Sequence, residues 1–244
     1  MCFELDSSPP IPIIRGAAVS HEELVLEAAD GNKFAAFAAT PDEPSGVGVA
    51  ILPDVRGLYP FYEELALRFA ERGMAAVAFD YFGRTAGVAK RGDDFEYMPH
   101  VEQTTPAGVQ ADVAASIRYL RDHGARSIFT VGFCFGGRAS WLAAADQEGL
   151  AGAVGFYGRP AAAAERASEL KAPILALQAG ADAHITAEDN AAFEQALRDA
   201  AADYDLVIYD GAPHSFFDRK QEEFAAASED AWAKVLAFIA AQQA

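Results

Sequence analysis

The sequence has few cysteines and no long hydrophobic run. Of its 244 residues only Cys2 and Cys134 are cysteines, and Cys2 lies close to a terminus, so no disulfide framework is expected. No apolar stretch approaches the roughly 20 residues that span a bilayer. The first residues also lack the basic region and apolar core of a secretory signal. We therefore expect a cytoplasmic protein with no membrane partner.

Basic residues are also scarce. The chain has 19 Lys and Arg against 36 Asp and Glu, which gives a formal net charge of −17. Such a field repels phosphate backbones and anionic lipid surfaces, so nucleic acid is not an expected partner. A small anionic substrate would need a local arginine to overcome the same repulsion.

Apolar residues, in contrast, are plentiful. Hydrophobic residues make up 52% of the chain, which is enough to build a large core and excludes a disordered protein. No Gly/Ser-rich or Pro-rich linker divides the sequence, and no repeat recurs at a fixed period. The sequence therefore predicts one domain over 1–244, with an extended N-terminal segment at 1–20.

Short apolar runs alternate with helical patterns along most of the chain. Residues 22–29 and 33–40 flank an Asp-Gly-Asn turn and predict an antiparallel hairpin. Six further runs predict buried strands, at 47–53, 74–80, 127–133, 151–157, 173–179 and 204–211. This order is typical of an α/β fold with a mostly parallel sheet of about eight strands and helices on both faces.

Helical spacing between the runs supports this architecture. Phe61, Leu65 and Phe69 recur every fourth residue, and Thr105 followed by Pro106 is a favourable helix start. The longest segment without an assigned element is 84–103. Loops of that length are often functional, so this excursion is a candidate for part of a substrate entrance.

The most specific motif is GFCFGG at 132–137, which lies between a predicted strand and a predicted helix. A G-x-nucleophile-x-G turn needs small neighbours because the nucleophile occupies a strained, sharply reversed backbone. At Cys134 a helix N-terminus would favour a thiolate and hold a developing oxyanion. The alternative is a buried, inert cysteine. The flanking glycines favour the nucleophile.

A thiol nucleophile needs a base, and His214 is the best placed of five histidines. It follows the predicted strand 204–211, so it lies at the same sheet edge as Cys134. His184 is the competing candidate. The remaining histidines, for which structural or surface positions are the simpler interpretation, are His21, His100 and His123, with substrate contact as the alternative for His100.

A carboxylate should orient the base, and Asp182 fits this role. It lies in AGAD directly after the predicted strand 173–179. Other acids in this part of the chain, for which a solvated surface position is expected, are Asp189, Asp203 and Asp205.

With GFCFGG, AGAD and APHSFF in this order, the sequence resembles the dienelactone hydrolase family, the carboxymethylenebutenolidases, of the α/β-hydrolase fold. The resemblance extends over nearly the whole chain and includes 52–84 and the GFYG at 155–158. It implies a hydrolase of a small lactone or ester that uses a Cys134, His214 and Asp182 triad and a thioester intermediate. The backbone amides of Val55 and Phe135 would form the oxyanion hole.

The resemblance also assigns roles at positions where this sequence departs from the family. Asp54 stands where family members often have a glutamate that pairs with the resting thiol. Arg84 matches one of two arginines that bind the substrate carboxylate. The position of the second arginine is occupied by Asp218 in this sequence, and Arg219 follows it directly. Arg56 is a further candidate cation, for which an ordinary surface position is an equal alternative.

Other functions on the same scaffold remain open. One is a general carboxylesterase or thioesterase, and another is a non-catalytic thiol sensor or binding protein. The sequence has no Cys/His cluster at ligand spacing and no glycine-rich phosphate loop, so neither a metal nor a cofactor is expected. The expected partner is a small-molecule ester or lactone, with or without an anionic group, and the oligomeric state stays open.

Overall fold

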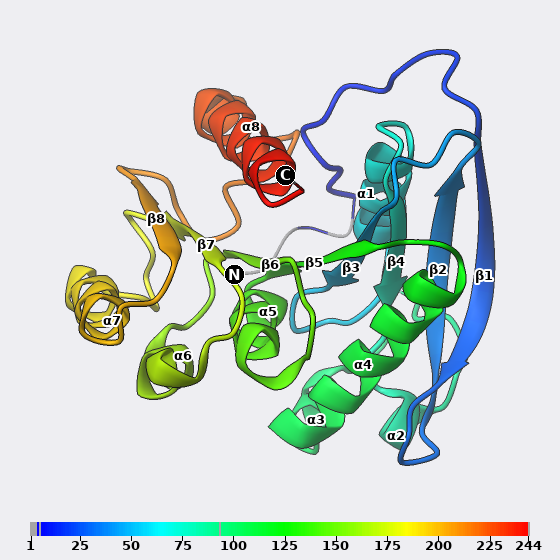
Figure 1. Ribbon diagram of the computed structural model, residues 1–244, viewed down its shortest axis with the longest axis horizontal. Coiled ribbons are helices and arrows are strands. Elements are labelled where there is room, and N and C mark those ends of the chain that lie inside the picture. Colours follow the sequence, from blue (N-terminus) through cyan, green and yellow to red (C-terminus); the bar gives the residue numbers. More distant parts are fainter. Residues whose placement is uncertain (1–3, 5, 93, 244) are drawn as a thin grey trace.

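The computed structural model describes residues 4, 6–92 and 94–243, and it is built around one eight-stranded sheet (Figure 1). The strands follow the order β1-β2-β4-β3-β5-β6-β7-β8 across the sheet. Their bounds are Val19–Glu27 (β1), Lys33–Pro41 (β2), Val47–Leu52 (β3), Ala75–Phe79 (β4), Ser127–Phe133 (β5), Gly152–Phe156 (β6), Ile174–Ala179 (β7) and Tyr204–Tyr209 (β8). This confirms the prediction of an α/β fold with about eight strands.

One strand, β2, runs opposite to the other seven strands of the sheet. β1 pairs antiparallel with β2, and β2 pairs antiparallel with β4. All remaining pairs, from β4 through β3 to β8, are parallel. The predicted hairpin is therefore confirmed, although β1 begins at Val19, three residues before the predicted run.

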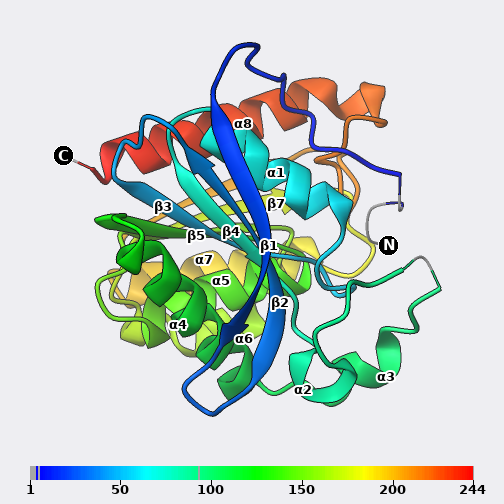
Figure 2. The ribbon, with the colours of Figure 1, turned by 90° about the vertical axis from the view of Figure 1, so that its right-hand side faces the viewer.

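Helices cover both faces of the sheet, which explains why β3, β6 and β7 are buried along their whole length. Apolar side chains of α1 and α8 pack on one face, and those of α4 to α7 pack on the other (Figure 2). The helices are Pro60–Ala70 (α1), Gly83–Ala86 (α2), Met98–Val101 (α3), Pro106–Asp122 (α4), Phe135–Asp146 (α5), Ala161–Glu165 (α6), Ala187–Asp199 (α7) and Ala225–Ala241 (α8), with short 3₁₀ turns at Ala167–Glu169 (η1) and Glu222–Phe224 (η2).

The strand order places the functional loops. β3 lies between β4 and β5. After β3 the chain crosses to β4 on one side, and after β5 it crosses to β6 on the other side, so the two connections diverge between β3 and β5. In open α/β sheets such a switch point forms a crevice at the carboxyl ends of the strands. The loop after β3 carries Val55 and the turn after β5 carries Cys134. The loops after β7 and β8 reach the same edge with Asp182 and His214.

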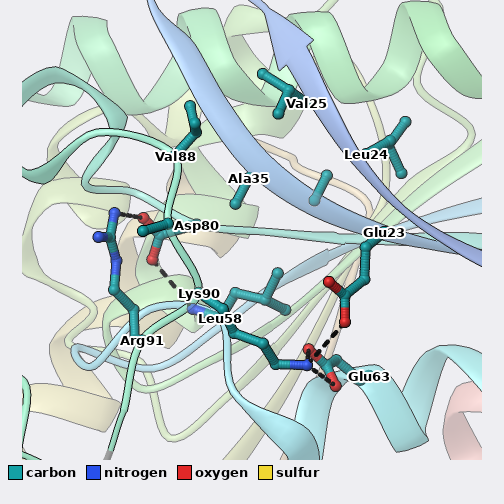
Figure 3. Close-up of a pocket in the computed structure, with 12 residues that line it drawn as sticks. Glu23, Leu24, Val25, Ala35, Leu58, Glu63, Asp80, Val88, Lys90 and Arg91 are labelled. Atoms are coloured by element: carbon teal, nitrogen blue, oxygen red, sulfur yellow. Dashed lines mark hydrogen bonds and ion pairs between the residues drawn. The ribbon is translucent and has the colours of Figure 1, made fainter.

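The predicted excursion contains the short helices α2 and α3, and two basic residues between them fasten it to the sheet (Figure 3). Lys90 Nζ lies 3.0 Å from a carboxylate oxygen of Glu23 on β1 and 2.8 Å from one of Glu63 on α1. Arg91 Nη2 lies 2.8 Å from the buried carboxylate of Asp80, directly after β4. These ion pairs hold the segment that leads to α3.

Within the residues that the structure describes, no helix combines the length and hydrophobicity that crossing a bilayer requires.

Candidate active site

Cys134 occupies the turn between β5 and α5 in a strained backbone conformation. Its φ is 55° and its ψ is −109°, a region that L-residues rarely adopt. Its amide donates a hydrogen bond to the carbonyl of Phe156 at 2.9 Å, which ties the turn to the neighbouring strand. The geometry is that of a nucleophile elbow, which lifts one side chain above the sheet edge at a helix N-terminus.

Glycines on both sides make this turn possible. A Cβ at Gly132 would overlap the backbone of Gly136, and a Cβ at Gly136 would overlap the carbonyl of Leu52. Gly137 approaches β6 in the same way, since its Cβ would lie 2.5 Å from the carbonyl oxygen of Phe156. The close packing of three backbone segments therefore requires the glycines of GFCFGG.

His214 and Asp182 form a short polar contact in the site. Nδ1 of His214 lies 2.6 Å from Oδ2 of Asp182. The other carboxylate oxygen of Asp182 accepts the backbone N–H of His184 at 2.8 Å. Two hydrogen bonds thus fix the carboxylate, and the carboxylate fixes the imidazole with Nε2 turned away from it. The ring of Tyr157 packs against the imidazole at a centroid distance of 4.9 Å.

The charges of the site shift the pKa of both partners. Burial alone lowers the pKa of His214, but hydrogen bonds to Asp182 and to Cys134, with the negative charges of both groups, outweigh burial and raise it to about 9. Burial raises the pKa of Asp182, and the hydrogen bonds from His214 and His184 more than offset this and lower it. The contacts of His214 therefore favour its protonated form.

The other candidates for the base and the carboxylate make different contacts. His184 lines the same cavity as His214, with its ring centroid 6.2 Å away, but it contacts Asp182 through its backbone N–H. Asp189 caps α7 by accepting hydrogen bonds from Thr186. The two remaining acids, both exposed, are Asp203 and Asp205.

A cavity of about 540 Å³ opens in front of Cys134. Its lining includes both residues proposed for the oxyanion hole, Val55 and Phe135. In the described part of the chain neither of their amides donates a hydrogen bond to a protein acceptor. Met98 of α3 also lines the cavity, so the excursion contributes to its wall, and its role as a substrate entrance stays a prediction. The full lining is Val55, Met98, Cys134, Phe135, Arg138, Tyr157, Arg159, His184, Ile185 and His214.

The match to known protein families agrees with this geometry. A model of the family described as "Dienelactone hydrolase family" matches residues 34–243.

The chain belongs to the dienelactone hydrolase family.

Relatives that carry a name are named as carboxymethylenebutenolidases. A Yersinia pestis protein named "Putative carboxymethylenebutenolidase" is 28% identical over 221 residues, which cover 84% of this chain and 83% of that protein. The carboxymethylenebutenolidase of Rhodococcus opacus is 27% identical over 251 residues and covers 98% of this chain and 96% of its own length.

A solved structure shows the same fold. The crystal structure of a Klebsiella pneumoniae protein described as "Putative Dienelactone Hydrolase" has a TM-score of 0.80 and 26% identity, and it covers 91% of this chain and 99% of that one. The predicted family and the α/β-hydrolase fold are thereby confirmed, and the family supports the prediction of a hydrolase that acts on ester bonds.

Asp54 is held by contacts within its own loop. Its carboxylate is buried and accepts hydrogen bonds from Arg56, whose Nε lies 3.1 Å from Oδ1 and whose Nη2 lies 2.8 Å from Oδ2. The hydroxyl of Tyr59 donates to Oδ2 at 3.0 Å. These contacts lie within the loop that carries Val55. Both carboxylate oxygens are therefore occupied by partners from their own loop.

Arg56 takes part in this loop structure and is not an ordinary surface arginine. Its side chain is only 13% exposed, and its guanidinium lies 4.3 Å from the ring centroid of Tyr59. Arg56 does not line the cavity at Cys134. Its contacts with Asp54 and Tyr59 fix the loop that carries Val55.

The structure does not bring Arg84 into the cavity. Its guanidinium pairs with Asp112 of α4 at 2.6 Å and with Asp30 of the β1–β2 turn at 2.7 Å. Asp112 is fully buried and would hold an uncompensated charge without this partner. Arg84 thus joins α2 to α4 and to the hairpin.

Arg219 also lies away from the cavity. The buried carboxylate of the neighbouring Asp218 accepts a hydrogen bond from Ser7 Oγ at 2.7 Å. The amide of Arg219 donates to the carbonyl of Ser8 at 3.0 Å. The N-terminal segment therefore holds this loop and turns Arg219 toward itself.

Two other arginines, which sequence reasoning did not single out, do line the cavity. Arg138 directly follows GFCFGG, and Arg159 directly follows the GFYG after β6. Their positions just beyond the carboxyl ends of β5 and β6 are the signal that would have found them.

A second, smaller cavity of about 170 Å³ lies between the excursion and the hairpin (Figure 3). Its charged side chains are paired with one another, as in the contacts of Lys90 with Glu63 and of Arg91 with Asp80. It contains neither a nucleophile nor a histidine. In the described residues no cluster of three or more His, Cys, Asp and Glu side chains is placed to hold a metal ion.

Proposed function

We propose that this member of the dienelactone hydrolase family is a cysteine-dependent hydrolase of a small lactone or ester. In this proposal Cys134 is the nucleophile, His214 is the acid and base, and Asp182 orients and charges the imidazole. The observation that carries the proposal is the alignment at one sheet edge of a strained cysteine, a histidine whose pKa that cysteine raises, and a carboxylate 2.6 Å from the histidine.

Acylation begins with the thiol proton on Nε2 of His214. The thiolate sulfur attacks the carbonyl carbon of the ester, a C–S bond forms, and the carbonyl π electrons move to oxygen. When this tetrahedral oxyanion collapses, the C–O bond to the leaving alcohol breaks. The imidazolium of His214 gives its proton to the alkoxide oxygen, which leaves a thioester on Cys134.

Deacylation reverses these roles. His214 removes a proton from water, and the resulting hydroxide attacks the thioester carbon. The second tetrahedral intermediate then expels the thiolate of Cys134, which the imidazolium again stabilises. For a lactone the acid and the alcohol stay in one product molecule.

Both tetrahedral intermediates need donors for their oxyanion. Val55, in the loop after β3, and Phe135, at the elbow, both line the cavity, and their amides would supply these donors. A single donor of this kind is worth about 3 kcal/mol in transition-state stabilisation. Arg56 and Asp54 support one of them by holding its loop.

A general carboxylesterase or thioesterase is the second candidate function. The cavity favours it, because about 540 Å³ is the size range of sites for drug-sized ligands and its walls include Val55, Met98, Phe135 and Ile185. The catalytic steps would be the same, and only the substrate would differ.

The test compares turnover of dienelactone, an aryl ester and an acyl thioester by the wild-type chain and by two cysteine variants. Cys134→Ala should lower kcat/KM for every substrate by at least about a thousandfold. Cys2→Ala is the matched control and should retain full activity. Comparison of kcat/KM among the three substrates separates the lactonase from the esterase or thioesterase. Full activity of Cys134→Ala would overturn the proposal, and an oxidisable Cys134 without turnover would support the thiol sensor instead.

A further inference from the structure

The cavity at Cys134 is cationic although the chain is strongly acidic. The formal charge of the whole chain is −17, yet none of the ten residues that line this cavity is an Asp or Glu. Beside His184 and His214, two arginines belong to the lining, Arg138 and Arg159. A local reversal of charge of this kind attracts an anion that the rest of the acidic surface would repel.

Arg138 lies in the first turn of α5, four residues after the nucleophile. Its amide donates to the carbonyl of Cys134 at 3.2 Å, so the two residues are separated by one turn of α5. The guanidinium carbon lies 5.1 Å from the ring centroid of Phe135, another lining residue. Stacking on this ring fixes the orientation of the half-buried side chain.

Arg159 reaches the same wall because two glycines let their backbones touch. A Cβ on Gly158 would lie 2.6 Å from the amide nitrogen of Arg138 and 2.8 Å from the carbonyl carbon of Gly137. Only glycine permits this approach. It brings the loop after β6 against the first turn of α5, so Arg138 and Arg159 line one side of the cavity.

Neither arginine is neutralised by a protein carboxylate. Among residues 4, 6–92 and 94–243, no Asp or Glu oxygen lies within ion-pair distance of Arg138 or Arg159. The charge of Arg159 contributes to lowering the pKa of the exposed Asp189, but more weakly than the hydrogen bonds from Thr186. By contrast, Arg84 is fully paired.

The space between the arginines and the nucleophile is apolar. Phe135, Met98, Ile185 and Val55 contribute most of the remaining wall. A ligand that reaches from Cys134 to the arginines therefore places an apolar chain between the reacting carbonyl and its charged end.

We propose that Arg138 and Arg159 form a carboxylate-binding subsite, and that the preferred substrate is an ester whose carboxylate is separated from the scissile carbonyl by an apolar chain. This inference rests on the proposed function, since it names the substrate class of the same site. The subsite uses residues of α5 and of the loop after β6. The arginine positions that the family resemblance implies, Arg84 and Arg219, lie elsewhere.

Two esters that differ only in the distal group test this subsite. The monoester of adipic acid with p-nitrophenol carries a carboxylate four methylenes from the ester carbonyl. In p-nitrophenyl heptanoate an ethyl group takes the place of that carboxylate. The wild-type chain should show a kcat/KM at least about tenfold higher for the adipate monoester, since charge-assisted hydrogen bonds give this discrimination. Arg138→Gln and Arg159→Gln should each reduce the ratio, and the double variant should bring it to about one.

A matched control is Arg15→Gln, which removes the same charge from an exposed position in the N-terminal segment, close to the end of α1. It should leave the ratio unchanged. An unchanged ratio in the double variant would overturn the subsite. If Cys134→Ala still hydrolysed both esters at the wild-type rate, the proposed function would fail instead.

Equilibrium binding decides the inference without turnover. Titration of the Cys134→Ala chain with 4-phenylbutyrate and with its uncharged amide, followed by calorimetry, compares the two distal groups directly. The carboxylate should bind at least about tenfold more tightly, and the difference should disappear when both arginines are replaced. Equal affinity for acid and amide would overturn the subsite whatever the kinetic result.

Discussion

Asp182 and His214 are 32 residues apart in the chain, and their side chains meet at 2.6 Å. Each follows one of two neighbouring parallel strands, β7 and β8, which pair from Ile174 with Tyr204 onward. Because parallel strands end at the same edge, the register of the sheet brings the two loops together. The contact therefore depends on the sheet and not on local sequence.

The first prediction concerns this contact. Asp182→Asn should lower kcat by about a thousandfold, because an amide cannot stabilise the imidazolium and permits the wrong tautomer of His214. The hydrogen bond from the His184 amide can be kept, so the fold should persist. Steady-state kinetics and circular dichroism check both statements. Asp203→Asn, at an exposed carboxylate, should leave kcat unchanged; an equal loss there would remove the special role of Asp182.

The second prediction concerns pH. The pKa of His214 is raised from the ordinary value of about 6.5 to about 9 in the folded chain. A raised pKa means that the folded state binds the proton more tightly, so its stabilisation is fully present below pH 6.5 and is lost as pH rises to 9.

The measurement for this prediction is urea unfolding between pH 6 and 9.5 for the wild type and for His214→Gln. The difference in unfolding free energy between the two chains should shrink across that window. A constant difference, or one that grows with pH, would show that the imidazolium is not stabilised in the folded state.

The sequence predicted those features that depend on local pattern or on strand order. Glycines at 132 and 136 mark the elbow because no side chain fits there. Cys134, Asp182 and His214 could be identified because each follows a predicted strand. The single-domain organisation and the catalytic roles themselves stay predictions.

Side-chain partners could not be predicted in the same way. Arg84 and Arg138 are both arginines beyond strand ends, yet one pairs with Asp112 and the other lines the cavity. The difference depends on the packing of α2 and α4, which no spacing in the sequence encodes. For the same reason the sequence did not reveal that Arg56 occupies the carboxylate of Asp54.

The third prediction concerns Asp54. Asp54→Asn keeps the shape of the side chain but leaves the largely buried Arg56 without its counter-charge. The loop that carries Val55 should then lose its fixed position, so kcat should fall by about tenfold or more with little change in KM. Asp42→Asn, at an exposed site, is the control.

A second measurement separates this role from pairing with the resting thiol, which stays a prediction from the family resemblance. The pH dependence of Cys134 alkylation by iodoacetamide should be the same in Asp54→Asn and in the wild type. A displaced profile would show that Asp54 acts on the thiol itself.

The fourth prediction concerns Arg84. Arg84→Gln should lower the free energy of unfolding by about 2 kcal/mol, because the buried Asp112 keeps only the amide of Asn32 as a partner. The ratio of kcat/KM for the adipate and heptanoate esters should not change. Urea unfolding and the two esters provide the measurements. A lost preference for the adipate ester with normal stability would place Arg84 in substrate binding after all.

The most direct test of the account is the mass of the enzyme during turnover. The chain is mixed with an aryl ester, quenched in acid within the first turnovers, and analysed intact and after digestion. The account predicts a mass increase of one acyl group, located on the peptide that contains Cys134 and absent from Cys134→Ala. Steady ester hydrolysis with no acyl group on Cys134, together with an active Cys134→Ala variant, would contradict it.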